Sequence, residues 1–153
     1  MGKTLIFQKI SIMSLKLSIL APDRIFWNAS AFEIILPTQT GQMGVLPNHT
    51  PTMTGLDIGV MLVRSSNSSE WTSMVLQGGF ALIQDNKVTI LVNDAELGSN
   101  IDQEKAQASL ATAQAQFDSA VSRGDLKEKI EASLAQKRAR AQLSASLQAG
   151  TRV

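Results

Sequence analysis

The side chains most often used in catalysis and metal binding are scarce in this sequence. His49 is the only histidine, and the chain contains no cysteine and no tyrosine. A zinc site with two histidines and a Cys–His nucleophilic pair are therefore both excluded. A serine triad would have to use His49, and no nucleophile-elbow motif accompanies it. Asp94 and Glu96 are better interpreted as a strand-end charge cluster than as a general acid and base. We expect no catalytic residue, no metal site and no cofactor.

The overall charge and hydropathy of the chain argue against nucleic acid and the membrane interior as binding partners. The formal net charge of +1 over 153 residues gives no support to nucleic-acid binding, which usually requires a strongly basic surface. No apolar run approaches the ~18–20 residues that a membrane-spanning helix needs, so we expect no direct membrane insertion. The length fits one domain, or one domain with an appendage.

The composition of the chain changes near Ser99. All four prolines and both tryptophans precede this position, and an alanine-rich stretch without proline follows it. We therefore predict a β-strand head over residues 13–99 and a helical arm over residues 100–153. Residues 1–12 are basic and short and carry no small-residue cleavage site, so we interpret them as a non-conforming N-terminal extension rather than a secretory signal.

Several stretches of the head alternate apolar and polar residues with the period of two that marks a half-buried strand. The alternating apolar residues are Leu15, Leu17 and Ile19; Phe32, Ile34 and Leu36; Ile58, Val60 and Leu62; Met74 and Leu76; and Val88, Ile90 and Val92. The stretches are short, and no helix-length crossover separates them. This spacing favours an antiparallel β-sandwich or barrel over parallel β-α-β units.

Two glycine-containing segments stand out within the head. The segment from Gly41 to Pro51 holds apolar side chains in a loop shaped by glycine and proline, and these side chains either pack under the sheet or face a partner. Gly78 and Gly79 adjoin a strand, where glycine permits a bulge or the close approach of another chain. Packing within the core is an equally good explanation of the pair.

The arm is predicted to form two antiparallel helices. Asp102 is suited to cap the first helix, and Gly124 interrupts the pattern before a second helix from about Leu126 to Gln148. The expected inner faces are Ala106, Leu110, Ala113, Phe117 and Val121 in the first helix, and Leu126, Ile130, Leu134 and Ala141 in the second. Alanine favours helix but buries little apolar surface, so we predict an arm that is weakly docked on the head. The predicted fold class is α+β, an N-terminal antiparallel β-sandwich followed by a C-terminal antiparallel two-helix hairpin.

A basic cluster lies in the second helix. Lys137, Arg138 and Arg140 follow Glu131, the last acidic residue of the chain. Cations are favoured near a helix C-terminus, so a solvated basic face is one interpretation and a surface for an acidic protein partner is the other. Nucleic acid is a poor candidate, because no aromatic residue accompanies the cluster.

Four stretches of sequence carry a resemblance to a known family. They are ILPTQTGQMGVLPNHTP at 35–51, GGFALI at 78–83, VTILVNDAE at 88–96 and LAQKRARAQL at 134–143. In their order and spacing, the chain from about Met13 to Leu147 resembles the epsilon subunit of the F-type ATP synthase, most closely the chloroplast or cyanobacterial form. The mitochondrial counterpart of this subunit is a further possibility within the family.

The resemblance implies a non-catalytic subunit of the central stalk, or rotor. It implies that the sandwich attaches to the gamma subunit and to the membrane rotor ring. It also implies that the C-terminal hairpin restrains ATP hydrolysis by meeting gamma and the catalytic alpha/beta hexamer. The implied location is the chloroplast thylakoid membrane, peripheral on the stromal side, or the cytoplasmic side of a cyanobacterial thylakoid.

The resemblance also assigns residues to these contacts. The rotor-ring contact maps to Gln42, Met43, Val45, Pro47 and His49, the gamma contact to Gly78, Gly79 and Phe80, and the inhibitory helix to Lys137, Arg138 and Arg140. Some bacterial members bind ATP through an IDxxRA-like motif and a later arginine, which map to Asp102, Lys105 and Arg138. Lys105 stands where the motif has arginine and cannot form a planar bidentate fork, so we do not expect nucleotide binding.

Two other classes of function remain open. An enzyme would need a catalytic set that this sequence lacks. A free-standing adaptor protein with a helical-hairpin interaction arm would be expected to show sustained heptads. Leu143 and Leu147 instead project to nearly the opposite side from the apolar stripe of the second helix.

Overall fold

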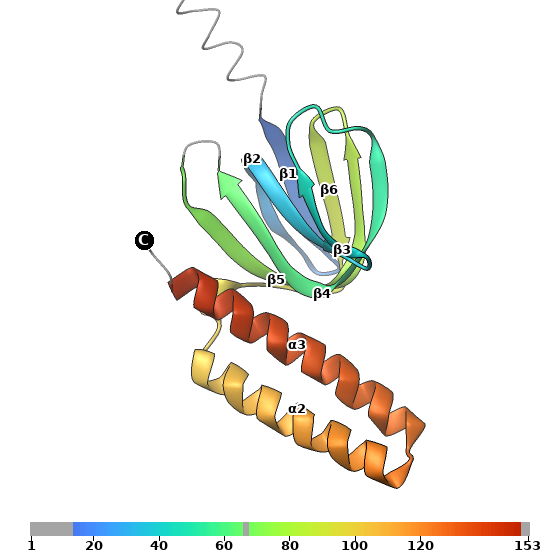
Figure 1. Ribbon diagram of the computed structural model, residues 1–153. Helices are drawn as coiled ribbons and strands as arrows, with labels where there is room; N and C mark the ends of the chain where they lie inside the picture. The colour runs from blue at the N-terminus through green and yellow to red at the C-terminus, as the bar shows by residue number, and fades with distance from the viewer. Residues whose placement is uncertain (1–13, 66–67, 151–153) are drawn as a thin grey trace, which may run out of the picture.

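The computed structural model describes residues 14–65 and 68–150, so the interpretation of residues 1–12 lies outside the described part of the chain. Strands come first and helices last (Figure 1). The strands are β1 (Leu15–Ala21), β2 (Arg24–Thr38), β3 (Gly41–Val45), β4 (Thr52–Ser65), β5 (Trp71–Gln84), β6 (Lys87–Val92) and β7 (Ala95–Leu97). The short helix η1 (Gly98–Asn100) then leads to α2 (Gln103–Arg123) and α3 (Leu126–Gly150). The change of composition near Ser99 falls within η1.

The strands close into a barrel-like sandwich. Their order is β1-β6-β5-β4-β2-β3, and β1 also pairs with β2, so the sheet closes on itself. β3 lies outside this ring beside β2, and β7 pairs with β5. Among the described strands every pairing is antiparallel except that of β1 with β6, which is parallel. The predicted sandwich is confirmed, with this one parallel pair as a departure from the expected pattern.

Three strands are much longer than the sequence pattern suggested. β2 has 15 residues and β4 and β5 have 14 each, and they curve around the head (Figure 1). The pairing of β2 with β4 shifts register between Ala31 and Glu33 and again between Ile35 and Thr38. Such irregularities bend and twist a strand. The side of a long strand that faces the core therefore changes along its length.

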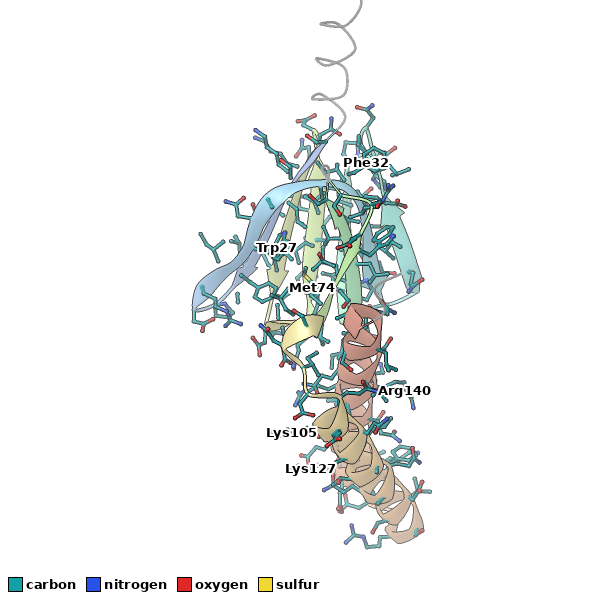
Figure 2. The ribbon with its side chains drawn as sticks, turned by 90° about the vertical axis from the view of Figure 1, so that its left-hand side faces the viewer. Trp27, Phe32, Met74, Lys105, Lys127 and Arg140 are labelled. Carbon is teal, nitrogen blue, oxygen red and sulfur yellow. The ribbon has the colours of Figure 1, made fainter. Side chains whose placement is uncertain are left out.

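The hydrophobic core draws side chains from every strand. Its fully buried large residues include Leu15, Leu17, Ile19, Ile34, Leu36, Met61, Met74, Leu76, Ile83 and Ile90. The expected inward-facing residues are confirmed in β1 and β6. Phe32 in β2 is an exception and is only partly buried. Its ring lies against the guanidinium of Arg64, 4.5 Å from ring centroid to Cζ, at the end of the head remote from the helices (Figure 2).

The alternation in β4 assigns the wrong face to the core. The buried side chains are Leu56, Met61 and Val63, whereas the expected Ile58, Val60 and Leu62 are only partly buried. Val60 packs instead against the cluster of Val75, Ala141 and Ala145, on the side of the sheet that α3 covers. Both faces of β4 are covered by protein around Val60, and alternation cannot show which of two apolar faces meets the core.

The helices form the predicted antiparallel hairpin. The Asp102 carboxylate accepts hydrogen bonds from the backbone N–H groups of Glu104 and Lys105, at 3.0 and 3.2 Å. Asp102 therefore caps α2 as expected. Gly124 ends α2 in the left-handed conformation, with a φ of 68°, which confirms the predicted break.

The inner faces of the hairpin consist mainly of alanine, and the expected leucine and isoleucine stripe of α3 is wrong. The buried alanines are Ala106, Ala113 and Ala120 in α2 and Ala132 and Ala139 in α3, whereas Ala141 and Ala145 of α3 are buried against the head. Leu126, Ile130 and Leu134 are instead exposed by 68%, 53% and 46%, and Val121 of α2 is exposed as well. Alanine lets two helix backbones approach closely, so the larger side chains lie at the edge of the contact.

The hairpin is docked on the head. Figure 1 shows α3 against the sheet and α2 on the far side of α3. α3 contacts β4, β5 and η1 as well as α2. Within residues 14–65 and 68–150, neither helix is both long and apolar enough to cross a membrane.

Candidate partner-binding surfaces

The residues expected at the rotor ring do not form one continuous loop. Gln42 and Met43 belong to β3 and pair with Pro37 and Leu36 of β2, whereas Pro47 and His49 follow that strand. Between these two groups, Val45 is fully buried in the core and supports the segment from inside. The expectation of a loop from Gly41 to Pro51 is therefore wrong for residues 41–45, because these residues form β3 and pair with β2.

Hydrogen bonds tie the loop after β3 to the turn between β5 and β6. The Asn48 N–H donates to Asn86 Oδ1 at 2.6 Å, and the Asn86 carbonyl accepts from the Lys16 N–H at 2.8 Å. Asn48, Asp85 and Asn86 have φ values of 66°, 51° and 60°, a conformation that asparagine and aspartate tolerate better than most residues. The loop and the turn therefore form one surface, at the end of the head remote from the helices (Figure 1). Sequence reasoning did not include Asn86 in it.

Packing within the chain explains the glycine pair of β5. Gly79 has a φ of 142°, and a Cβ atom there would overlap the carbonyl oxygen of Leu91 in β6. Gly78 has a φ of 72°. The sequence left open whether these glycines permit the approach of another chain or serve packing within this one. At Gly79 the segment that approaches is β6 of the same chain. The adjacent Phe80 is exposed by 56%.

An exposed apolar surface surrounds Phe80. Phe80 lies opposite Leu91 of β6, and Leu82, two residues further along β5, lies opposite Met53 of β4. Residues so related share one face of a sheet. We call Met53, Phe80, Leu82 and Leu91 the outer apolar patch, and they are exposed by 48–73%. Contiguous exposed apolar residues mark protein-interaction sites. Of this patch, the sequence named only Phe80, as part of the gamma contact; apolar residues at both odd and even positions of β5 were an available signal for the rest.

Small side chains form the contact between α3 and the head. The buried cluster consists of Val75, Ala141 and Ala145, with Val60 and Ile101 packed against it. The Ser73 hydroxyl donates a hydrogen bond to the Ala145 carbonyl oxygen at 2.8 Å. A Cβ atom on Gly98 would overlap the Ser73 hydroxyl and crowd the Ala145 carbonyl. The contact is close but small, and weak docking stays a prediction.

Two polar contacts accompany this cluster. The Lys137 ammonium pairs with the Asp57 carboxylate, with 3.3 Å between Nζ and Oδ2. Gln142 Nε2 donates to Glu96 Oε2, also at 3.3 Å. The side chains of Lys137 and Asp57 are exposed by 49% and 38%, so water screens their attraction, and pairs of this kind contribute less than about 1 kcal/mol. Lys137 can therefore leave Asp57 and pair with another carboxylate at little cost in free energy.

Lys137 differs from the two arginines expected beside it in the inhibitory helix. Arg138 and Arg140 are exposed, and in the part of the chain that the structure describes neither forms an ion pair. Figure 2 shows Arg140 on α3, below the head. Two guanidinium groups are thus available to an acidic partner even while the hairpin is docked.

The residues of the possible nucleotide motif are not brought together. The Asp102 carboxylate is engaged in capping α2. Gln114 and Gln136 are hydrogen-bonded across the hairpin and indicate its register. In this register Arg138 lies about two turns, or ~10 Å along the axis, from the level of Lys105. Among the described residues there is also no group of three or more His, Asp or Glu side chains that could hold a metal ion.

Known proteins share both the sequence and the fold. Residues 14–98 match the family described as ATP synthase, Delta/Epsilon chain, beta-sandwich domain. The chain is 53% identical over 129 residues to the chloroplastic ATP synthase epsilon chain of Tupiella akineta, which covers 84% of this chain and 95% of the relative. The corresponding protein of Nephroselmis olivacea is 56% identical over 128 residues, covering 84% and 92%.

A solved structure matches the whole arrangement of head and hairpin. A chain in the cryo-EM structure of the Euglena gracilis mitochondrial ATP synthase, OSCP/F1/c-ring in rotational state 1, has a TM-score of 0.77 and 27% identity. The match covers 88% of this chain and 82% of that one. The higher identity to the chloroplastic proteins agrees with the predicted chloroplast type rather than the mitochondrial alternative. Sandwich, hairpin and sequence together show that the chain belongs to the epsilon-chain family of the ATP synthase, a non-catalytic subunit of that complex.

Proposed function

We propose that this chain is a rotor subunit of a chloroplast ATP synthase and links the gamma subunit to the membrane rotor ring. Its relatives are named as chloroplastic epsilon chains, and the similar Euglena structure contains F1 and a c-ring. The location that follows is the thylakoid membrane, peripheral on the stromal side. The chain would serve there by transmitting torque through a rigid closed sheet.

Two surfaces of the head support this attachment. The outer apolar patch suits a lasting contact with gamma, because stable interfaces bury apolar side chains at their centre. The loop after β3 suits the rotor ring, because the hydrogen bond from Asn48 to Asn86 holds Pro47 and His49 in a defined position. Val45 supports this loop from the core, and Gly79 sets the spacing of the strands beneath Phe80.

The hairpin is proposed to restrain ATP hydrolysis after it leaves the head. The observation that carries this proposal is the small contact of α3 with the head, combined with the exposed Arg138 and Arg140. A switch requires two states within a few kcal/mol of each other, so that binding to a partner can change their populations. In the extended state, the basic side of α3 would meet an acidic surface of the alpha/beta hexamer and block rotation.

A reversible cross-link between β7 and α3 tests this movement. Glu96 and Gln142 are in contact through the ends of their side chains, and the chain has no cysteine, so Glu96→Cys with Gln142→Cys introduces a single pair of thiols that a short, reducible bifunctional thiol reagent can bridge. The variant is added to an ATP synthase from which the epsilon chain has been removed. When cross-linked, it should attach to gamma normally and lose its inhibition of ATP hydrolysis.

The controls separate the movement from the substitutions. The reduced and alkylated double variant, and each single variant, should inhibit hydrolysis like the unchanged chain. Full inhibition by the cross-linked protein would show that the hairpin need not leave the head. Loss of attachment to gamma would show that head and hairpin do not have separate roles.

A further inference from the structure

Lys137 takes part in two different surfaces. Its ammonium pairs with Asp57 of β4, and its side chain also lines a groove of about 320 Å³ on the outside of the hairpin. The groove is lined by residues of α3 between Leu126 and Lys137 and by Phe117 of α2. One cation therefore connects the docking of the hairpin with a surface that is open to other molecules.

The groove has an apolar floor and a basic rim. Its floor is formed by Phe117, Leu126, Ile130 and Leu134, and its rim by Lys129 and Lys137. The three aliphatic side chains of the floor are exposed by 46–68%. Within residues 14–65 and 68–150, Lys129 forms no ion pair. Apolar side chains flanked by cations are complementary to an amphipathic helix that carries carboxylates beside its apolar face.

We propose that this groove receives an acidic amphipathic helix of a partner protein and that Asp57 competes with this helix for Lys137. The inference rests on the proposed function, because it concerns the partner that the hairpin meets. While Lys137 pairs with Asp57, the docked hairpin withholds one of the two rim charges. A partner carboxylate on Lys137 in turn removes an ion pair between α3 and β4. Docking of the hairpin therefore weakens binding of the partner helix, and binding of the partner helix weakens docking of the hairpin by the same factor in its equilibrium constant.

Binding of a designed peptide to the full chain tests the competition. The probe is a synthetic helical peptide with leucines along one face and glutamates beside them, labelled with a fluorophore. Asp57→Asn should bind this peptide about two- to fivefold more tightly than the unchanged chain, the range expected from an exposed ion pair. The substitution preserves local structure, because asparagine can also accept the Ile58 N–H that Asp57 Oδ1 accepts at 2.8 Å.

Two lysine variants provide matched comparisons. Lys137→Gln should weaken peptide binding and abolish the effect of Asp57→Asn, because the shared cation is gone. Lys129→Gln should also weaken binding but leave the effect of Asp57→Asn intact, since Lys129 lies on the rim without contacting Asp57. A peptide with glutamine in place of every glutamate should bind the unchanged chain and Asp57→Asn equally.

Docking itself supplies an independent measurement. Spin labels on Ala29→Cys in β2 and Ala115→Cys in α2, both exposed positions, report the distance between head and hairpin. The glutamate peptide at saturation should lower the ratio of docked to undocked chains by the same two- to fivefold factor, and the glutamine peptide should not. Equal peptide affinities of the unchanged chain and Asp57→Asn, an Asp57 effect that persists with Lys137→Gln, or no binding of the glutamate peptide would overturn the inference. The cross-linking experiment on ATP hydrolysis uses neither residue, so failure of the proposed function would be seen separately.

Discussion

Gly79 and Gly98 occupy positions where a Cβ atom would overlap a neighbouring segment of the chain. At Gly79 the neighbour is the carbonyl oxygen of Leu91, and the φ of 142° adds a conformation that other residues rarely adopt. At Gly98 the limit is space alone, because the Ser73 hydroxyl and the Ala145 carbonyl lie there. The first glycine sets the spacing of two strands, and the second sets how closely α3 approaches the head.

Replacing Gly79 with alanine should lower the free energy of unfolding of the head by about 2–4 kcal/mol, because the new methyl group meets backbone atoms in a strained conformation. Urea unfolding followed by tryptophan fluorescence measures this change, since both tryptophans lie in the head. Gly44→Ala is the matched control, because nothing lies within 4 Å of a Cβ atom there. Similar unfolding midpoints for the two variants would contradict the tight contact at Gly79.

β4 and α3 each contact a different part of the molecule on each of their sides. β4 carries apolar residues on both faces, because one face lines the core and the other, at Val60, lies under α3. α3 buries alanines and leaves Leu126, Ile130 and Leu134 at its edge, where they form the floor of the groove. In β4 and α3, the positions of the large apolar residues in the sequence therefore predict poorly which of them are buried. In α3 the buried side is the one with small side chains, because these allow the closest approach of the neighbouring element.

The cap at Asp102 is expected to contribute to the stability of α2. Asp102→Ala removes the acceptor for the N–H groups of Glu104 and Lys105, so it should destabilise α2 by about 1 kcal/mol. Hydrogen exchange should become faster in α2 and stay unchanged in the strands. Asp102→Asn keeps a side-chain oxygen at the cap and should exchange nearly like the unchanged chain. Equally fast exchange in both variants would show that charge, rather than capping, stabilises this end.

The proposed partners of the whole molecule fall on separate surfaces. The outer apolar patch belongs to the sheet, the tethered loop after β3 lies at the end remote from the helices, and the groove lies on the hairpin (Figure 1). A change at one surface should therefore leave binding at the others intact.

Attachment to gamma should depend on the outer apolar patch. Phe80→Ser with Leu91→Ser should weaken binding to isolated gamma subunit at least about tenfold, because large apolar side chains at an interface centre each contribute more than 1 kcal/mol. Titration calorimetry measures the affinity, and an unchanged unfolding midpoint confirms that the head is intact. Val121→Ser, at an apolar position of α2 exposed by 50%, is the matched control and should bind normally. Equal loss of affinity in both variants would exclude the patch as the specific site.

Local pattern was sufficient to predict the strand head, the two helices, the cap at Asp102, the break at Gly124 and the lack of a catalytic set. Each of these depends on the types of neighbouring residues, or on which residue types occur at all. Local pattern also placed Lys137 in the second helix, which the structure confirms. The family resemblance assigned Phe80 to a contact with gamma, but neither pattern nor resemblance identified Asp57 as the partner of Lys137 or the other members of the outer apolar patch.

Those remaining features required the assembled fold. Asp57 and Lys137 are 80 positions apart in the chain, and the outer apolar patch combines three strands. The burial of Val45, the inner face of β4 and the alanine face of α3 likewise depend on what covers each side of an element. Apolar periodicity shows that a side is covered, whereas only the packing of distant segments decides which side meets the core, which meets a helix and which stays open to a partner.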